Sequence, residues 1–190
     1  LYLVGGSVRD ALLGRLGNDL DFTTPARPDV VYSILEEWAE TVWDTGIDYG
    51  TVSAAYKGQQ IEITTFRSDS YDGDSRNPDV VYGDTLEGDL VRRDFTVNAM
   101  AIELRPDGTR EFHDPMGGLQ HLADRILDTP DAPEISFHDD PLRMLRAARF
   151  AAQLEFDVAK RVRGAMIDMA AEIQRITVER VQVELNKLIC

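Results

Sequence analysis

The sequence predicts an α+β fold in which a head built on a mixed β-sheet is followed by an all-helical neck. In the first part of the 190 residues, short alternating apolar runs are separated by glycine turns and a helical stretch, a pattern typical of a mixed sheet. From Asp139 onward, apolar residues recur at helical spacing. We therefore expect a head at residues 1–135 and a neck at residues 136–190.

The head is predicted to open with strand, turn, helix and strand in close succession. Residues 1–4 are apolar and strand-like, residues 5–7 (Gly-Gly-Ser) suit a turn, and residues 8–13 suit a helical turn. Gly14 fits the position just after a helix end, where a positive φ is common. Residues 19–23 alternate as a second strand does.

An amphipathic helix and a hairpin are predicted next. Residues 29–41 have helical periodicity. The apolar residues expected on one side of this helix are Val30, Ile34, Leu35 and Trp38. Residues 51–56 and 60–66 alternate as strands, and Lys57-Gly58 between them suits a hairpin turn.

The remainder of the head is predicted to contain a loop and a second hairpin. Residues 68–90 are rich in Asp and Gly with little periodicity, which indicates a mobile acidic loop. Residues 99–104 and 110–113 suit two strands joined by a turn at residues 106–108. These strands complete the mixed sheet.

The neck is predicted from helical periodicity alone. The apolar positions that carry it are Leu142, Leu145, Phe150, Val162, Met166, Met169, Val181, Leu185 and Leu188. The chain begins without a methionine inside an apolar run and ends inside this helical pattern. It is therefore interpreted as a fragment of a longer protein, with the neck truncated at its C-terminus.

Composition excludes several classes of protein. With 43% hydrophobic and 28% charged residues, the chain can bury a core, and its apolar runs are far shorter than the roughly 20 residues of a membrane span. The one cysteine, Cys190, allows no intrachain disulfide and no Cys-based metal site, which favours a cytoplasmic setting. The net charge of −14 argues against a broadly basic RNA-binding surface.

Three carboxylates suggest a metal site. Asp19 and Asp21 lie at i and i+2 of a predicted strand, so both side chains point to one face. Glu62, between two isoleucines on a later strand, points away from the core and could add a third carboxylate. Such oxygen ligands suit Mg²⁺, and two ions about 3.5–4 Å apart would suit phosphoryl chemistry. The alternative for an Asp-x-Asp pair alone is a solvated strand face.

A phosphate site is predicted just upstream of these carboxylates. Gly5, Gly6 and Ser7 lead into a helix, where free backbone N–H groups attract an anion. Arg9 on the first turn could add a charged donor. The alternative is a plain tight turn with Arg9 paired to Asp10.

These motifs together resemble the class II tRNA nucleotidyltransferases and the bacterial poly(A) polymerases. The segments that carry the resemblance, in family order, are Gly5-Gly6-Ser7-Val8-Arg9-Asp10, Leu12-Leu13-Gly14-Arg15, Asp19-Leu20-Asp21, residues 61–67, Arg92-Arg93-Asp94-Phe95-Thr96-x-Asn98-Ala99, Asp114-Pro115-x-Gly117-Gly118, Asp140-x-x-Arg143-x-x-Arg146 and Glu179-Arg180. The resemblance implies a polymerase-β-like nucleotidyltransferase head with metal carboxylates at Asp19, Asp21 and Glu62.

The resemblance also implies roles outside the metal site. Asp94 and Asn98 would lie near the ribose, although a helix cap or a structural hydrogen bond is the alternative for both. The acidic segment 68–90 matches a region that the family uses as a flexible element in the switch from C to A addition. An idle surface loop would have the same composition.

Asp140 and Arg143 are predicted to select the nucleobase. A carboxylate only accepts hydrogen bonds and a guanidinium only donates them. Cytosine and adenine each offer an amine donor beside a ring-nitrogen acceptor, whereas guanine and uracil offer a carbonyl beside an N–H. An Asp–Arg pair would therefore accept C and A, and it would reject G and U at about 1–3 kcal/mol for each buried group left unsatisfied.

Structural alternatives exist for these neck residues. Pro141 suits the first helical position, which would make Asp140 an N-cap, and Arg143 could pair with Asp139 at i+4. The family usually has Glu-Asp where this chain has Asp139-Asp140, a change that keeps the charge.

Other polar residues are given supporting roles or none. Arg146 and Arg149 could hold phosphates or support the base-reading pair, or form a salt-bridged face. Arg180 is expected to pair with Glu184 within one helix. The histidines, which form no ligand-spaced set, are His113, His121 and His138.

These residues predict nucleotidyl transfer, and the family resemblance implies that the reaction is CCA addition to tRNA. The 3′-hydroxyl of the RNA would attack the α-phosphate of CTP or ATP in a reaction that needs Mg²⁺, and tRNA would be held mostly by regions outside this chain. The alternatives are a poly(A) polymerase, an A-adding or CC-adding specialist, and a non-catalytic nucleotide-binding module.

Overall fold

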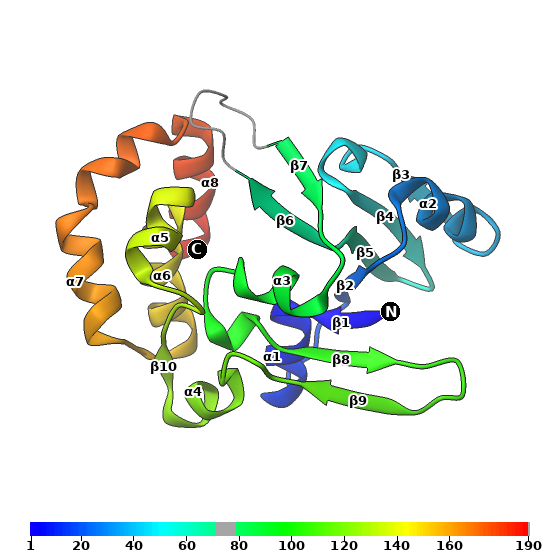
Figure 1. The fold of residues 1–190 in the computed structure, drawn as a ribbon, viewed down its shortest axis with the longest axis horizontal. Coiled ribbons are helices and arrows are strands. Elements are labelled where there is room, and N and C mark those ends of the chain that lie inside the picture. The colour runs from blue at the N-terminus through cyan, green and yellow to red at the C-terminus, as the bar shows by residue number, and fades with distance from the viewer. Residues whose placement is uncertain (71–78, 190) are drawn as a thin grey trace.

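A computed structural model, which describes residues 1–70 and 79–189, has a seven-stranded mixed sheet beside a group of helices (Figure 1). The strands lie in the order β3 (Thr41–Trp43), β4 (Thr51–Tyr56), β5 (Gln59–Thr65), β2 (Asp19–Thr24), β1 (Tyr2–Val4), β8 (Ala101–Leu104) and β9 (Arg110–His113). Only β2 and β5 pair in parallel within this sheet. The predicted α+β class with a mixed sheet is confirmed.

Both predicted hairpins are present. Lys57 (φ 49°) and Gly58 (φ 77°) join β4 to β5, and positive φ at both central residues matches the twist of a tight hairpin. Gly108, with φ 84°, lies in the turn between β8 and β9. The sequence signal was strong here because the turn residues and the strand alternation agree.

The glycine segment after β1 differs from the prediction. Helix α1 (Gly5–Leu12) begins directly at Gly5, so no separate turn precedes it. Gly5 has φ +67°, a conformation that a side chain disfavours, and this one residue makes the sharp change of direction. Gly14, with φ +71°, follows the helix end as expected.

Helix α2 (Pro28–Glu36) is shorter than predicted and buries a different face. Val31 and Leu35 pack on the sheet, whereas Val30 and Ile34 are about half exposed. The predicted side was therefore wrong for most of its residues. The segment expected to continue the helix turns into β3, which is an edge strand.

The predicted acidic loop at 68–90 contains regular structure where it is described. Strands β6 (Arg67–Ser70) and β7 (Asp79–Tyr82) pair in antiparallel, and α3 (Leu86–Val91) follows with Thr85 as its N-cap. Residues 71–78, which include Gly73, lie outside the described residues. The loop prediction was wrong for the two strands and the helix, since Asp-rich composition hid them.

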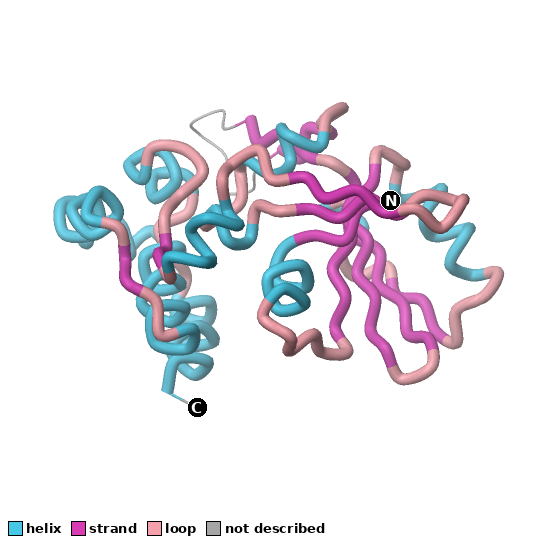
Figure 2. The backbone as a smooth tube through the Cα atoms, turned by 90° about the horizontal axis from the view of Figure 1, so that it is seen from below, coloured by secondary structure: helices cyan, strands magenta, loops and turns pink. Residues whose placement is uncertain are grey.

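Two of the remaining elements are short 3-10 helices in the head, η1 (Ile47–Tyr49) and η2 (Thr96–Asn98). The others follow along the chain as α4 (Gly118–Asp124), β10 (Ile126–Leu127), α5 (Pro133–Asp139), α6 (Leu142–Leu154), β11 (Asp157–Val158), α7 (Lys160–Asp168), η3 (Ala170–Arg175) and α8 (Val178–Ile189). Figure 2 shows the strands of the large sheet on one side and the C-terminal helices on the other. No described helix has both the length and the apolar character that a membrane span requires.

One core joins the two parts of the molecule. Its buried residues are Val8, Phe95, Val97, Met100, Leu122, Leu127, Ala147, Phe150 and Phe156. These residues come from α1 and η2 in the predicted head and from α6 in the predicted neck, among other segments. The proposed boundary at residue 135 falls inside α5, and the division into two domains stays a prediction.

Candidate active site

The three predicted carboxylates lie on one face of the sheet. In the parallel pair β2–β5, Asp21 is the register partner of Glu62, and Asp19 lies two residues before Asp21 on the same face. Ile61 and Ile63 point to the opposite face and are buried under α2. The strand alternation that separates isoleucine from glutamate therefore also brings Glu62 to Asp21.

The environment of Asp21 favours a bound cation. Burial raises the pKa of the Asp21 carboxyl, and the nearby charges of Glu62 and Asp19 raise it further, against the lowering effect of Arg93 and Arg9. A divalent ion would relieve this repulsion, since clustered carboxylate oxygens are the ligands that Mg²⁺ prefers. The donor set present here therefore fits such an ion.

The start of α1 is tied to these carboxylates. The Ser7 hydroxyl accepts the backbone N–H of Asp21 at 2.9 Å and lies 3.3 Å from the carbonyl oxygen of Asp19, to which it donates. A Cβ on Gly5 would lie 3.7 Å from a carboxylate oxygen of Asp21. The helix N-terminus thus lies beside the carboxylates, while the Ser7 hydroxyl is engaged with β2.

Arg9 adopts the structural alternative. Its guanidinium donates to Asp10 at 2.8–2.9 Å and to the Asn98 side-chain oxygen at 2.7 Å, and it lies over the ring of Phe150. It does not line the cavity described next. A buried guanidinium needs local acceptors, and Asp10 and Asn98 supply them here.

The carboxylate face opens into a cavity of about 340 Å³ between the sheet and the helices. Asp21 and Glu62 line it from the sheet, and Asp140 lines it from the neck. The arginines around it are Arg67, Arg92, Arg93, Arg143, Arg146 and Arg180. The six arginines slightly outnumber the five carboxylates that line the cavity, in a chain of net charge −14, so the cavity is a candidate site for an anionic ligand.

Arg93 lines the cavity close to Gly5 and lowers the pKa of Asp21 through its charge, and no role was predicted for it from the sequence. One of its terminal nitrogens lies 3.0 Å from where a Cβ on Gly5 would be, and the other donates to buried Asp89 at 3.0 Å. Arg92 also contacts Asp89, at 3.5 Å. The Arg92-Arg93 run in an otherwise acidic segment was the signal that could have identified both.

Asp94 and Asn98 form a buried network with two arginines. Asp94 accepts hydrogen bonds from Asn98 at 2.9 Å, from the Phe95 N–H at 2.8 Å, and from Arg146 at 2.6 and 2.9 Å. Burial alone would raise the pKa of Asp94, but Arg146 and these hydrogen bonds lower it overall. The same ion pair raises the pKa of Arg146 against the effect of its burial. Asp94 and Arg146 line the cavity, whereas Asn98 holds Asp94 and Arg9 together.

Asp140 both accepts a hydrogen bond from the start of α6 and lines the cavity. One carboxylate oxygen accepts the backbone N–H of Leu142 at 3.2 Å, and the other accepts a hydrogen bond from Arg180 at 2.9 Å. This hydrogen bond to the start of α6 agrees with the structural alternative for Asp140, although Pro141 stands at the N-cap position of that helix. Each carboxylate oxygen can accept more than one hydrogen bond, so capacity is left for a ligand.

Arg143 faces the cavity from the first turn of α6. Its guanidinium donates to the Ser136 hydroxyl at 2.8 Å and to the backbone carbonyl of Arg92 at 2.6 Å. These contacts join α5, α6 and the end of α3. A guanidinium has five N–H groups, so donors remain for a ligand.

The predicted pair of Arg180 and Glu184 was wrong. Glu184 is 3% exposed and pairs with Arg149 of α6, whereas Arg180 extends to Asp140. The i+4 spacing favours such a pair on an isolated helix, but α8 packs on α6, and the buried carboxylate pairs with the arginine on that side. Arg149 does not line the cavity.

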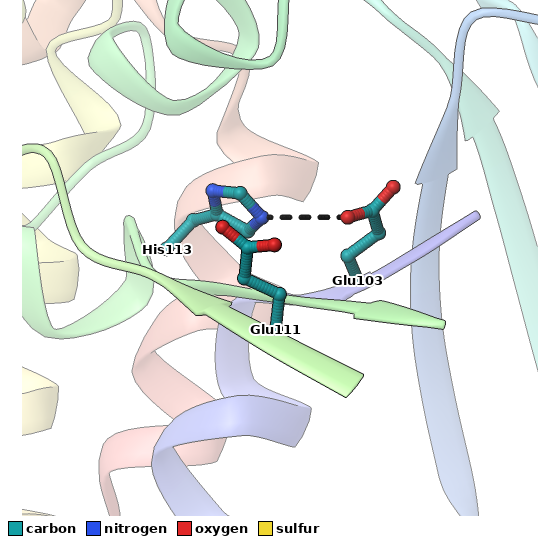
Figure 3. Close-up of side chains that lie close together, drawn as sticks. All are labelled: Glu103, Glu111 and His113. Atoms are coloured by element: carbon teal, nitrogen blue, oxygen red, sulfur yellow. Dashed lines mark ion pairs between the residues drawn. The ribbon is translucent and has the colours of Figure 1, made fainter. Parts of the chain in front are cut away.

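A second acidic group lies away from the cavity on the hairpin β8–β9 (Figure 3). Glu103, Glu111 and His113 lie close together there, although the histidines form no ligand-spaced set in the sequence. Arg105 pairs with both glutamates, at 2.7 Å to Glu103, and His113 lies 3.8 Å from Glu103. A cation would have to displace Arg105, so the cavity carboxylates fit an ion better.

Two known protein families match segments of this chain. The family described as "Poly A polymerase head domain" matches residues 1–128, and that described as "Probable RNA and SrmB- binding site of polymerase A" matches residues 155–190. The chain belongs to the poly(A) polymerase head-domain family. The resemblance noted from the sequence is confirmed.

Individual members of this family are similar over nearly the whole chain. The CCA-adding enzyme of Levilactobacillus brevis is 45% identical over 189 residues, which cover 99% of this chain and 46% of that protein. The CCA-adding enzyme of Lactobacillus helveticus is 42% identical over 188 residues, covering 98% of this chain and 45% of that protein. The chain thus spans less than half the length of these curated relatives.

Solved structures of the family share the fold. The Bacillus stearothermophilus CCA-adding enzyme in complex with CTP superposes with a TM-score of 0.85 at 40% identity, over 98% of this chain and 43% of that one. The Thermotoga maritima CCA-adding enzyme complexed with tRNA_CCA superposes with a TM-score of 0.77 at 30% identity, over 99% and 42% of the two chains.

Proposed function

We propose that this chain is the catalytic part of an enzyme that adds C, C and A to the 3′ end of tRNA from CTP and ATP. One observation carries the proposal: a single cavity is lined by the sheet carboxylates Asp21 and Glu62 and by the candidate base-reading pair Asp140 and Arg143. A nucleotide bound there would place its phosphates and its base against chemically suitable groups. CCA-adding activity in the relatives supports the same conclusion, and a tRNA substrate implies a cytoplasmic enzyme.

The carboxylates would hold the divalent metal. Asp19, Asp21 and Glu62 would be the ligands, and we propose two Mg²⁺ ions, as expected for nucleotidyl transfer. When bound, the ions supply charge stabilisation for the attacking hydroxyl and for the triphosphate. The pKa of Asp21, raised in the free protein, would fall on binding.

The phosphates would be held at the start of α1. Backbone N–H groups of Gly5, Gly6 and Ser7 offer donors and the positive end of the helix dipole. Arg93 would supply the charged donor that was predicted at Arg9, since buried Asp89 holds Arg93 at the helix start.

The reaction transfers a nucleotide onto RNA. The oxygen of the RNA 3′-hydroxyl forms a bond to the α-phosphorus of the bound triphosphate, the bond from that phosphorus to pyrophosphate breaks, and the hydroxyl proton passes to solvent. The protein contributes position and charge stabilisation rather than a nucleophile. Asp94, held by Arg146 and Asn98, would bind the ribose.

Base choice would follow from the two neck residues. Asp140 would accept from the exocyclic amine of C or A, and Arg143 would donate to the adjacent ring nitrogen. Arg180 would keep the Asp140 carboxylate in place, and Arg146, which is paired with Asp94, would add a positive charge that interacts with Asp140. No RNA template is needed for this selection.

The test is incorporation of labelled CTP and ATP into tRNA that lacks its 3′ end, in the presence of Mg²⁺. Ordered addition of C, C and A is the expected result. Long A tails would identify a poly(A) polymerase, and addition of A alone or of two C residues would identify a specialist. Absence of incorporation, by this chain and by a version extended to the length of its relatives, would leave a nucleotide-binding module.

A further inference from the structure

Ser136 contacts both members of the candidate base-reading pair. Its hydroxyl accepts a hydrogen bond from the Arg143 guanidinium at 2.8 Å. Its backbone carbonyl accepts the N–H of Asp140 at 3.2 Å. Ser136 is 5% exposed and belongs to α5, the helix that ends where Asp140 begins the turn into α6.

Arg143 is oriented by contacts from two parts of the chain, and one of its terminal nitrogens also lies 3.5 Å from the backbone carbonyl of Ser136. The hydroxyl of Ser136 holds one terminal nitrogen, and the backbone carbonyl of Arg92 holds the other at 2.6 Å. With both terminal nitrogens held, the plane of the guanidinium is fixed. The Ser136 hydroxyl is the only one of these two acceptors that a substitution can remove.

We infer that Ser136 is a positioning residue for nucleobase selection, which sets the edge that Arg143 presents to the base. This inference rests on the proposed function of Asp140 and Arg143. Cytosine gains a hydrogen bond when Arg143 faces its ring nitrogen, whereas uracil meets a clash there between its N–H and the guanidinium donors. A displaced Arg143 therefore weakens CTP binding and relieves the penalty on UTP.

Substitution of Ser136 by alanine separates the two contacts. The backbone carbonyl stays, with its contacts to Asp140 at 3.2 Å and to Arg143 at 3.5 Å, and the shorter hydrogen bond from Arg143 to the hydroxyl, at 2.8 Å, is lost. We expect Ser136→Ala to lower the preference for CTP over UTP roughly tenfold, the effect of losing one hydrogen bond to a charged group. The preference for ATP over GTP should fall in parallel.

The control is Thr129→Val. Thr129 is 1% exposed, and its hydroxyl donates to the Asp131 carbonyl at 2.6 Å without contacting Arg143. This variant also loses one buried hydroxyl, so it should lose similar stability and keep the CTP preference. Ser136→Cys, which fills nearly the same space with a weak acceptor, should act in the same direction as Ser136→Ala.

The experiment measures the dissociation constants of CTP, UTP, ATP and GTP with Mg²⁺ for the 190-residue chain and its variants. The inference is supported if the wild type prefers CTP over UTP and ATP over GTP, and if this preference falls in both Ser136 variants but not in Thr129→Val. A wild-type preference that Ser136→Ala leaves unchanged overturns it and leaves the proposed function intact. A wild-type chain without any preference overturns the base-reading role and the inference together.

Discussion

The carboxyl group of Asp21 connects the electrostatics of the cavity with the proposed chemistry. Burial and the charges of Glu62 and Asp19 raise its pKa, so its ionised form is disfavoured until a cation binds. A metal site is expected to destabilise the folded protein when the ion is absent, because the carboxylates that bind the ion then repel one another.

Asp21→Asn should therefore remove activity and stabilise the free fold. Incorporation should fall by roughly 1,000-fold or more, since metal charge stabilisation is worth several kcal/mol. A carboxyl with a raised folded pKa binds more protons when folded, so its contribution to stability falls as pH rises through that pKa. At pH 7 without divalent ions, the variant should unfold at higher denaturant concentration than the wild type.

The measurement is denaturant unfolding at pH 5 and pH 7, with and without Mg²⁺. Mg²⁺ should raise the stability of the wild type and leave that of Asp21→Asn unchanged. The difference in stability between the two metal-free proteins should be smaller at pH 5 than at pH 7. The exposed Asp48 offers a matched control, because Asp48→Asn should change neither activity nor stability. Near-normal turnover in Asp21→Asn would refute the metal assignment.

At the scale of elements, helix α8 is fixed to α6 by a buried ion pair. Arg149 of α6 and Glu184 of α8 pair while both side chains are about nine-tenths buried. The attraction in such a pair is offset by the cost of removing two charges from water, but loss of one partner leaves the other charge buried and alone.

Glu184→Ala should destabilise the protein by about 3–5 kcal/mol, because Arg149 would keep its charge without a carboxylate. Replacing both residues together, Arg149→Met with Glu184→Leu, should recover most of this loss. Urea unfolding measures each variant, with Glu179→Ala on the exposed side of the same helix as the control. If the double variant were no more stable than Glu184→Ala, lost packing rather than unpaired charge would explain the loss.

The elements show which features the sequence determines locally. The Lys57-Gly58 hairpin was predictable because turn residues and alternation lie within one short segment. The burial of Val31 in α2 was not, since Val30 and Ile34 are equally apolar and only the position of the sheet chooses between the faces. The strands β6 and β7 were missed because their pairing joins residues on either side of an acidic segment.

The same distinction holds for the candidate site. Asp19, Asp21 and Glu62 follow from strand alternation and a parallel pairing, so the sequence could place them on one face. The Arg92-Arg93 run was a visible signal, but the roles of Arg93 and Ser136 depend on tertiary contacts with Gly5 and with Arg143 that only the fold defines. The family resemblance identified the motifs, but the contacts between them could be recognised only in the folded structure.

For the whole molecule, the shared core predicts that head and neck unfold together. Phe150 of α6 packs edge-on against Phe95 of the head, with ring centroids 5.8 Å apart, and the Arg9 guanidinium lies 5.1 Å from the Phe150 ring. The cavity lies between these same parts, so its geometry depends on their contact. A neck that separated from the head would take Asp140 and Arg143 away from Asp21.

Phe150→Ala should lower the stability of both parts equally, by about 3–5 kcal/mol. Both tryptophans, Trp38 and Trp43, lie in the head, so their fluorescence follows the head, whereas circular dichroism at 222 nm follows the helices that dominate the neck. We expect coincident urea transitions by the two probes in wild type and variant, as cooperative unfolding requires. Ile167→Ala, at a position 71% exposed on α7, should leave both midpoints unchanged. Two separate transitions in the wild type would show that head and neck are independent domains, and nucleotide selection would then require an interface that forms only on binding.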